Sequence, residues 1–301
     1  SLLTARTVEW GGAMRPNPLR RIGTWQVRDG VATWHSRDES ARVAEVAEGV
    51  LELTLCWPGL TAADGELGLR IDAVQRARGW QFGVSSESLA GAGRMALNLQ
   101  PPVPAGDAAH AAAVGSDAIL PDATMRRIWP TVFALIGESA PDGMLDLVHM
   151  RHRIERAPEA VPALRSQRHR ADGYTLTTVA GAGEWISTDD FFVRSPGVPG
   201  ESSVTPSKEA VDTPHLLLGA VEGRAPRDLT TFAAVSGDLN PIHRSDSLAR
   251  LVGLSGRIVH GMWTSAFGQR AAVELACAGD VDRLQEWDIT FMAPVLPGDE
   301  L

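Results

Sequence analysis

The sequence has 301 residues, of which 44% are hydrophobic and 22% are charged, a balance typical of a globular protein. At about 150 residues for each domain, the length suggests roughly two domains. The net charge of −9 argues against a general nucleic-acid or membrane-surface binder, because such proteins carry a basic footprint. The two cysteines, Cys56 and Cys277, are too few for a disulfide framework or a zinc ribbon, although one disulfide between them stays open.

No apolar run approaches the roughly 18 residues that a membrane-spanning helix needs. The first residues also lack the basic and apolar segments of a secretory signal, so we expect a cytoplasmic protein. The chain begins with Ser1 rather than Met, and its last predicted unit has too few strands to cover its helix. We therefore interpret the chain as an excerpt of a longer polypeptide.

The first 75 residues alternate short β-like runs with turn signals. Asp29-Gly30 lies between two such runs, and this dipeptide is a strong hairpin signal. Residues 50–55 alternate apolar and polar side chains as a strand does, whereas residues 67–84 fit a strand or a helix. A stretch rich in Pro, Gly and Ala at 101–115 indicates a loop.

The middle third contains one apolar helix candidate at 123–136, although Pro130 argues against a continuous helix there. Three strand-like runs follow this helix, at residues 144–155, 174–180 and 185–194. The next residues, to about Thr213, are rich in Pro, Gly and Ser. This composition indicates a linker and therefore a domain boundary.

Helical patterns dominate the last third of the chain. Two short helices are predicted first, one at 228–235 and one from about residue 245 to 253. A longer helix at 261–277 is apolar on most sides, which is typical of a helix buried all round. We expect a curved sheet to wrap this helix, and the run at 287–295 is a strand candidate for it.

An acid and a histidine lie in the segment Ser236-Gly-Asp-Leu-Asn-Pro-Ile-His243. On a helix Asp238 and His243 would point about 140° apart, but the glycine and the proline favour a loop in which the two side chains can converge. Asp and His are suited to proton transfer near neutral pH, and Asn240 can hold the loop or the acid by a hydrogen bond. The same residues also fit an ordinary Asx turn with a surface hydrogen bond.

A second segment, Gly256-Arg-Ile-Val-His-Gly-Met262, precedes the long helix. The first N–H groups of a helix lack partners within it, and a glycine at this point lets a ligand oxygen approach them closely. Such a position can stabilise a developing oxyanion. Taken alone, the segment is better explained by a tight turn at Gly261 and a buried His260.

Together the two segments resemble a known pattern. S-G-D-x-N-P-I-H, followed about a dozen residues later by x-G-x-I-V-H-G-M, is similar to the MaoC-like hydratases and dehydratases of hot-dog fold. The continuation through Trp263-Thr-Ser-Ala266 to Asp299 resembles the dehydratase region of bacterial type I fatty acid synthases. The resemblance covers about residues 228–301, and it extends more weakly to a degenerate, non-catalytic hot-dog copy upstream.

The fold class implied by this resemblance is α+β. We expect a tandem, or double, hot-dog fold in which curved antiparallel sheets wrap central helices and the C-terminal unit is incomplete. The expected domains are an N-terminal β-rich segment at 1–75, a degenerate hot-dog unit at 76–200, a linker at 201–214 and a catalytic MaoC-like unit at 215–301.

The resemblance also implies the site residues. In this family the Asp and His of the loop, here Asp238 and His243, handle the proton and the water at a β-hydroxyacyl thioester. The amide of the glycine matching Gly261 holds the thioester carbonyl, and Asn240 and His260 are candidates for substrate binding. No metal is expected. His243 as base with Asp238 as acid is one assignment, and the reverse roles and a shared water stay open.

The implied activity is that of a hydro-lyase, the 3-hydroxyacyl-[acyl-carrier-protein] dehydratase region of a type I fatty acid synthase. It eliminates water from (3R)-hydroxyacyl thioesters to give trans-2-enoyl thioesters. The alternatives are a free-standing (R)-specific enoyl-CoA hydratase and a non-catalytic scaffold segment of a megasynthase.

No cofactor is expected in this region, because the substrate is carried on the phosphopantetheine of acyl carrier protein or on CoA. The expected partners are acyl carrier protein and the other domains of the same synthase, in a homo-oligomeric megasynthase. Neither nucleic acid nor membrane is expected as a partner.

Two further motifs carry weaker predictions. Residues 91–96 match G-x-G-x-x-A, but no good strand precedes them, which argues against a dinucleotide site. His149 and His152 lie on a predicted strand, where positions three apart face opposite sides. We therefore expect a solvated strand face rather than a shared metal, with contact to a carrier's phosphate as the alternative.

Overall fold

A computed structural model describes residues 2–10, 13–57, 67–77, 79–85, 106–139, 147–157, 160–170, 173–194 and 219–301. The chain forms two compact units, each assembled from separate segments. The first unit comprises Ser1–Asn98, Gly137–Asp146 and Leu239–Ile258, and the second comprises Leu99–Ile136, Leu147–Asp238 and Val259–Leu301. Both cysteines are free. In the described part of the chain, no helix is both long enough and apolar enough to cross a membrane.

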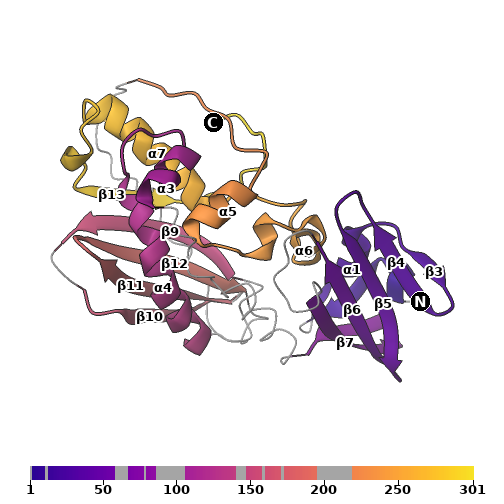
Figure 1. Cartoon of the computed structure of the whole chain (residues 1–301). Helices are drawn as coiled ribbons and strands as arrows, with labels where there is room; N and C mark the ends of the chain where they lie inside the picture. Colours follow the sequence, from indigo (N-terminus) through magenta and orange to yellow (C-terminus); the bar gives the residue numbers. More distant parts are fainter. Residues whose placement is uncertain are drawn as a thin grey trace. The chain divides into compact units, whose positions relative to one another are not determined.

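The first unit contains an eight-stranded sheet in the order β2-β1-β8-β7-β6-β5-β4-β3 (Figure 1). Its strands are β1 (Thr7–Trp10), β2 (Ala13–Pro16), β3 (Gln26–Arg28), β4 (Val31–His35), β5 (Ser40–Ala47), β6 (Val50–Cys56), β7 (Leu67–Arg76) and β8 (Gly79–Val84). The predicted hairpin is confirmed, since Asp29 and Gly30 take φ angles of 50° and 79° between β3 and β4. Residues 67–84, which fitted a strand or a helix, form two strands.

The hydrophobic core of the first unit includes a helix from far along the chain. The chain begins with a 3₁₀ turn at Leu2–Thr4. One face of the sheet packs on the short helices α1 (Pro18–Ile22) and α6 (Asp246–Leu251). Leu248 and Leu251 of α6 are buried in the same core as the residues of β6 and β7. The first sheet thus extends past residue 75, to Val84. Its core includes α6, which the sequence analysis assigns to the catalytic unit.

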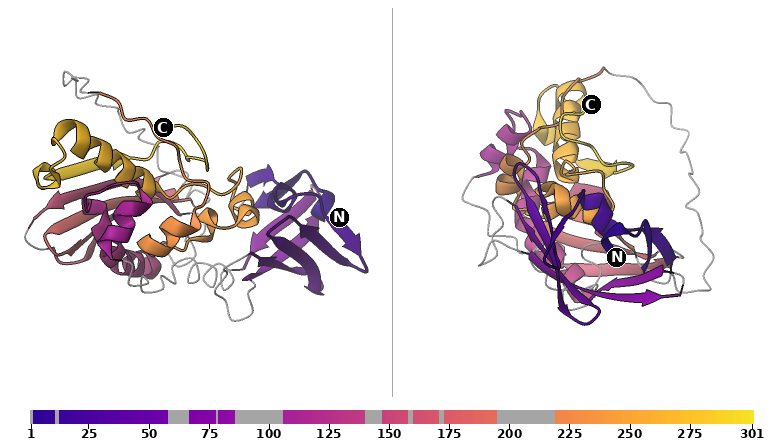
Figure 2. Two further views of the ribbon diagram at one scale, coloured as in Figure 1. Left: turned by 45° about the horizontal axis from the view of Figure 1, so that its top comes forward. Right: turned by 90° about the vertical axis from the view of Figure 1, so that its right-hand side faces the viewer.

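The second unit contains a curved, five-stranded antiparallel sheet in the order β10-β11-β12-β9-β13 (Figures 1 and 2). Its strands are β9 (Leu147–Arg156), β10 (Ala163–Arg170), β11 (Gly173–Ala182), β12 (Trp185–Arg194) and β13 (Glu286–Thr290). The helical elements are α3 (Asp107–Ala113), η2 (Pro121–Thr124), α4 (Met125–Ser139), α5 (Thr230–Ser236), α7 (Gly261–Ala276) and η5 (Val281–Arg283).

Helices α4 and α7 pack on the same face of this sheet. Trp129 of α4 lies against Phe191 of β12, with their ring centroids 6.3 Å apart. On α7, Gly268 lies so close to Trp287 of β13 that an added Cβ would come within 2.8 Å of the indole ring. The indole Nε1 also donates to Ser265 Oγ at 3.0 Å. The α+β class and the helix-on-sheet packing expected of hot-dog units are therefore confirmed.

The two helices share one continuous sheet instead of having one sheet each. Strand β9 follows α4 in the chain and β13 follows α7, and these two strands pair antiparallel, with Trp287 opposite Ile154. In the described residues, β13 is the one strand of this sheet that comes from the C-terminal segment.

Several local predictions need correction. The loop predicted at 101–115 contains helix α3, because the run Asp107-Ala-Ala-His-Ala-Ala-Ala113 is rich in the strongest helix former. Pro130 lies inside a continuous α4, where burial of Trp129 and Val132 outweighs the cost of about 3 kcal/mol for an internal proline. The predicted strand at 287–295 ends at Thr290, and β10 was not predicted.

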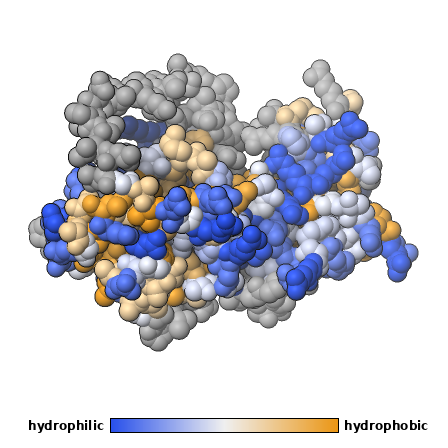
Figure 3. Space-filling view, turned by 90° about the horizontal axis from the view of Figure 1, so that it is seen from above, coloured by the Kyte–Doolittle hydropathy of each residue, from blue (hydrophilic) through white to orange (hydrophobic). Residues whose placement is uncertain are grey.

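Helix α7 is not buried all round. Its buried residues form one stripe along the helix, made of Met262, Trp263, Ser265, Ala266, Gln269 and Val273. On the other side Leu275 is 38% exposed. Figure 3 shows hydrophobic surface on the visible face of the second unit.

The linker predicted at 201–214 and the motif at 91–96 lie outside the described residues.

Candidate functional site

The predicted acid Asp238 follows helix α5 directly. This helix ends at Gly237, whose φ of 76° is left-handed and therefore favours glycine. The backbone N–H of Asp238 donates to Ser236 Oγ at 3.2 Å, and the side chain is half-buried. Asp238 is the last residue of its segment of the second unit.

His243 lies in the first unit, in a short 3₁₀ turn (η4, Pro241–His243) that Asn240 caps. Asn240 Oδ1 accepts from the backbone N–H of Ile242 at 3.2 Å, so Asn240 holds the loop as expected. The His243 side chain is buried, and its Nδ1 lies 2.8 Å from the carbonyl oxygen of Ile258.

This contact determines the tautomer of His243. A carbonyl oxygen only accepts, so Nδ1 of His243 donates its hydrogen to Ile258. In the neutral ring Nε2 then carries the lone pair and can accept a proton. The His243 ring is therefore fixed in the form that a general base requires.

His260 and Gly261 begin helix α7. His260 is the N-cap residue, it is buried, and its Nε2 donates to the backbone carbonyl of Asp238 at 3.1 Å. The contact fixes the backbone of Asp238, so His260 supports the loop in addition to any role in substrate binding. Ile258, which anchors His243, precedes His260 by two positions.

Gly261 provides the first N–H of α7. The carbonyl of His260 accepts from Trp263 and Thr264, and no acceptor for the Gly261 N–H occurs among the described residues. A Cβ at this position would lie 3.3 Å from the ring of Phe291, so a side chain would have to displace that ring. The oxyanion role of the Gly261 N–H stays a prediction.

Within each unit, the structure brings some of the predicted residues together. Asp238, His260 and Gly261 meet in the second unit through the His260–Asp238 hydrogen bond. Asn240 and His243 meet in the first unit through the turn that precedes α6.

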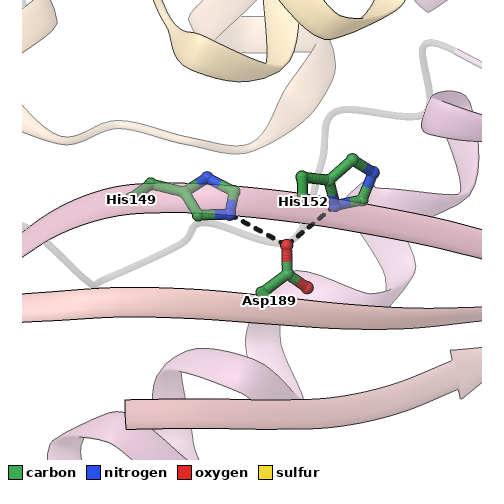
Figure 4. A group of neighbouring side chains, drawn as sticks. All are labelled: His149, His152 and Asp189. Carbon is green, nitrogen blue, oxygen red and sulfur yellow. Dashed lines mark hydrogen bonds and ion pairs between the residues drawn. The ribbon is translucent and has the colours of Figure 1, made fainter. Parts of the chain in front are cut away.

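The prediction for His149 and His152 is wrong. Both side chains lie on the same face of β9 and contact one oxygen of Asp189, on the neighbouring strand β12 (Figure 4). The distances to Asp189 Oδ1 are 2.9 Å from His149 Nε2 and 2.7 Å from His152 Nδ1. The reason is a β-bulge at Met150, which shifts the register between β9 and β12 and turns one histidine to the face of the other.

The contacts continue toward α7. His152 Nε2 lies 3.0 Å from Asp122 Oδ1, and the side-chain amide of Gln269 donates to the same oxygen at 2.6 Å. The backbone N–H of Asp122 in turn donates to Gln269 Oε1 at 3.2 Å. We call His149, His152, Asp189 and Asp122 the histidine–aspartate network. It connects the sheet to the middle of α7.

The network is buried and charged. Burial opposes protonation of His152, but the carboxylates of Asp122 and Asp189 outweigh it and raise the pKa of His152 to about 10. Burial likewise opposes ionisation of Asp189, but His152 and His149 outweigh it and lower the pKa of that carboxyl below its usual range. Ser187 Oγ donates to the second oxygen of Asp189. At neutral pH the network therefore holds an ionised Asp189 beside a protonated His152.

The network also has the composition of a metal site. One ligand atom each from His149, His152 and Asp189 lies within 4.8 Å of the others, and two imidazoles with a carboxylate suit zinc. The same atoms already form hydrogen bonds to one another. The absence of a metal from the chemistry of Asp238 and His243 stays a prediction.

Residues 199–301 match the model of the MaoC like domain. The chain is 42% identical over 78 residues to the fatty acid synthase subunit beta of Aspergillus oryzae, which is 26% of this chain and 4% of that subunit. It is 34% identical over 67 residues to the peroxisomal enoyl-CoA hydratase 2 of Arabidopsis thaliana, 22% of each protein.

Among solved structures, HtdX of Mycobacterium tuberculosis is similar to this chain, with 20% identity and a TM-score of 0.49. That similarity covers 66% of this chain and 82% of HtdX. The matched stretch spans only 4% of the Aspergillus oryzae subunit and 22% of the Arabidopsis thaliana hydratase. The segment that holds Asp238, His243 and Gly261 lies inside the residues that match the MaoC like domain.

Proposed function

We propose that this chain carries the 3-hydroxyacyl-[acyl-carrier-protein] dehydratase region of a type I fatty acid synthase. The observation that carries the proposal is the state of His243, a buried imidazole whose Nδ1 is tied to Ile258 and whose Nε2 can accept a proton. The identity to the Aspergillus oryzae fatty acid synthase subunit supports the choice of synthase. Acyl carrier protein and the other synthase domains are the partners in this proposal.

The reaction removes water from a (3R)-hydroxyacyl thioester. His243 Nε2 takes the proton from C2, and the electron pair of that C–H bond forms the C2–C3 double bond. The C3–O bond breaks, and the hydroxyl leaves as water with a proton from Asp238. The Gly261 N–H donates to the thioester oxygen and stabilises the enolate-like transition state. The product is a trans-2-enoyl thioester, and a proton passed from His243 to Asp238 restores both residues.

A second candidate is an (R)-specific enoyl-CoA hydratase. The identity to the Arabidopsis thaliana hydratase favours it, and the same residues would run the reverse reaction on a CoA thioester. The two candidates differ in the carrier of the acyl group, so a comparison of substrates separates them.

The test measures dehydration of a carrier-bound (3R)-hydroxyacyl substrate beside hydration of crotonyl-CoA. We expect His243→Ala and Asp238→Asn each to lower turnover by roughly 100-fold or more, the usual contribution of a positioned acid or base. The control is His35→Ala, since His35 is an exposed histidine on β4. Near-normal turnover in both variants would contradict the proposal, and a preference for crotonyl-CoA would favour the hydratase.

A further inference from the structure

Glu39 is a buried carboxylate in the first unit, far in sequence from the predicted catalytic loop. It lies just before β5, in a turn closed by the hydrogen bond from Ser36 N–H to the Glu39 carbonyl at 2.8 Å. The backbone N–H of Glu39 also donates to Ser36 Oγ at 3.1 Å. These two hydrogen bonds hold the backbone of Glu39, and the residue is 8% exposed.

The Glu39 carboxylate accepts four hydrogen bonds from the beginning of helix α6. Its Oε2 accepts from Ser245 Oγ at 3.0 Å, and from Ser247 N–H and Oγ at 2.8 and 2.5 Å. Its Oε1 accepts from the N–H of Asp246 at 2.6 Å. All four donors are neutral, and the ion pairs among the described residues do not include Glu39. Hydrogen bonds to a carboxylate are roughly twice as strong as neutral ones, so this is a strong anchor.

Helix α6 is also anchored by packing. Leu248 and Leu251 are buried in the core of the N-terminal sheet. The guanidinium of Arg250 donates to the carbonyl of Ile22, at the end of α1, at 3.3 Å. The helix therefore cannot shift without opening the core or breaking the contacts of Glu39.

His243 lies two positions before Ser245, in a turn continuous with α6. The carbonyl of Pro241 accepts from the N–H groups of Arg244 and Ser245, at 2.9 and 2.7 Å. The backbone of His243 is thus fixed on its C-terminal side by the anchor of α6, while its ring is fixed by Ile258.

We propose that Glu39 is a positioning residue for His243, and that the N-terminal sheet serves as the scaffold of the catalytic loop. The inference rests on the proposed function. Loss of the carboxylate would release Ser245 to Ser247 and let the His243 ring move away from the substrate. Because a displacement of about 1 Å can cost 100-fold in rate, we expect kcat to fall roughly 10-fold to 100-fold with KM little changed.

The experiment uses the full-length protein with Glu39→Ala, and Glu48→Ala as the matched control, since Glu48 is an exposed carboxylate on the β5–β6 turn of the same sheet. We expect kcat to fall in Glu39→Ala and to stay normal in Glu48→Ala. Formate can occupy the space left by the buried carboxylate, so added sodium formate should restore part of kcat where sodium chloride does not. A normal kcat in folded Glu39→Ala would overturn the proposal.

A second variant and a second measurement cover the other outcomes. If Glu39→Ala does not fold, Glu39→Gln keeps the volume but turns an amide toward the N–H donors, and it should also lower kcat. Amide hydrogen exchange at Arg244–Ser247 should become faster in either variant, whatever the activity of the protein. If the wild type shows neither dehydration nor hydration, the proposed function fails, and exchange alone decides whether Glu39 holds the loop. Unchanged exchange overturns the inference.

Discussion

Glu39 and Asp189 are two buried carboxylates, one in each unit, and their partners differ in kind. Glu39 accepts from hydroxyl and backbone N–H groups, which carry no titratable charge. Asp189 lies between two imidazoles, one of which also contacts a second carboxylate. The first anchor therefore joins one carboxylate to neutral donors, whereas the second joins carboxylates to imidazoles. Stability measurements should separate the two.

Asp189→Asn should produce the largest loss of stability. The change removes the shared negative charge and leaves the buried His152 with Asp122 as its remaining carboxylate partner. Breaking a buried pair from one side costs about 3–5 kcal/mol, so the free energy of unfolding should fall by that amount at pH 7. Denaturant unfolding measures it. The control Asp190→Asn changes the next residue on β12, which is half-buried and accepts from Thr177, and equal losses in both variants would contradict the role of the network.

The pH dependence of stability should distinguish the two anchors. The pKa of His152 is about 10 in the folded protein and 6.5 in the unfolded reference, so the folded state binds more protons between these values. Its contribution to stability is full below pH 6.5 and is lost as the pH rises toward 10. The free energy of unfolding should fall by about 1.4 kcal/mol per pH unit in this window.

The same measurement has two comparison variants. Glu39→Gln should keep the slope of the wild type above pH 6.5, because it leaves every imidazole in place. His152→Gln should remove most of the slope. A wild type whose free energy of unfolding does not change between pH 6.5 and 10 would show that His152 is neutral in the folded protein.

The smallest effect is expected for an ion pair on the opposite face of the same strand. Arg151 of β9 contacts Asp288 of β13 with its Nε 2.8 Å from Oδ1, and its side chain is 49% exposed. Exposed pairs contribute about 0–1 kcal/mol, and salt screens them. Arg151→Gln should therefore lower the free energy of unfolding by less than about 1 kcal/mol, and by less still in 1 M salt. If Arg151→Gln lowered the free energy of unfolding as much as Asp189→Asn does, the exposed ion pair would contribute as much to stability as the buried network, contrary to this prediction.

Features that depend on neighbouring residues could be predicted from the sequence. The turn at Asp29-Gly30, the end of α5 at Gly237 and the beginning of α7 at Gly261 all follow from local backbone preferences. The candidate site residues in the C-terminal segment came from a resemblance over consecutive motifs. The structure adds the tautomer of His243, which depends on the carbonyl of Ile258.

Features that depend on distant partners could not be predicted. Glu39 and Ser245 are 206 positions apart, and neither residue type indicates the other. The common face of His149 and His152 depends on a bulge, which is defined by the register of the neighbouring strand. Asp122 and Gln269 are 147 positions apart and pair only after both helical elements have packed. The period-2 rule gave the wrong answer for β9 because it assumes an uninterrupted strand.

Strand β9 has β12 on one edge and β13 on the other, and the two partners lie at very different distances along the chain. Strand β12 ends at Arg194, whereas β13 begins at Glu286, about 130 residues after β9 ends at Arg156. At a synthesis rate of roughly 5–20 residues per second, the second edge of β9 waits about 7–26 s for its partner on the ribosome. During that interval its unpaired backbone groups could pair with a strand of another chain. This edge of β9 therefore stays open to misassembly until β13 has been made.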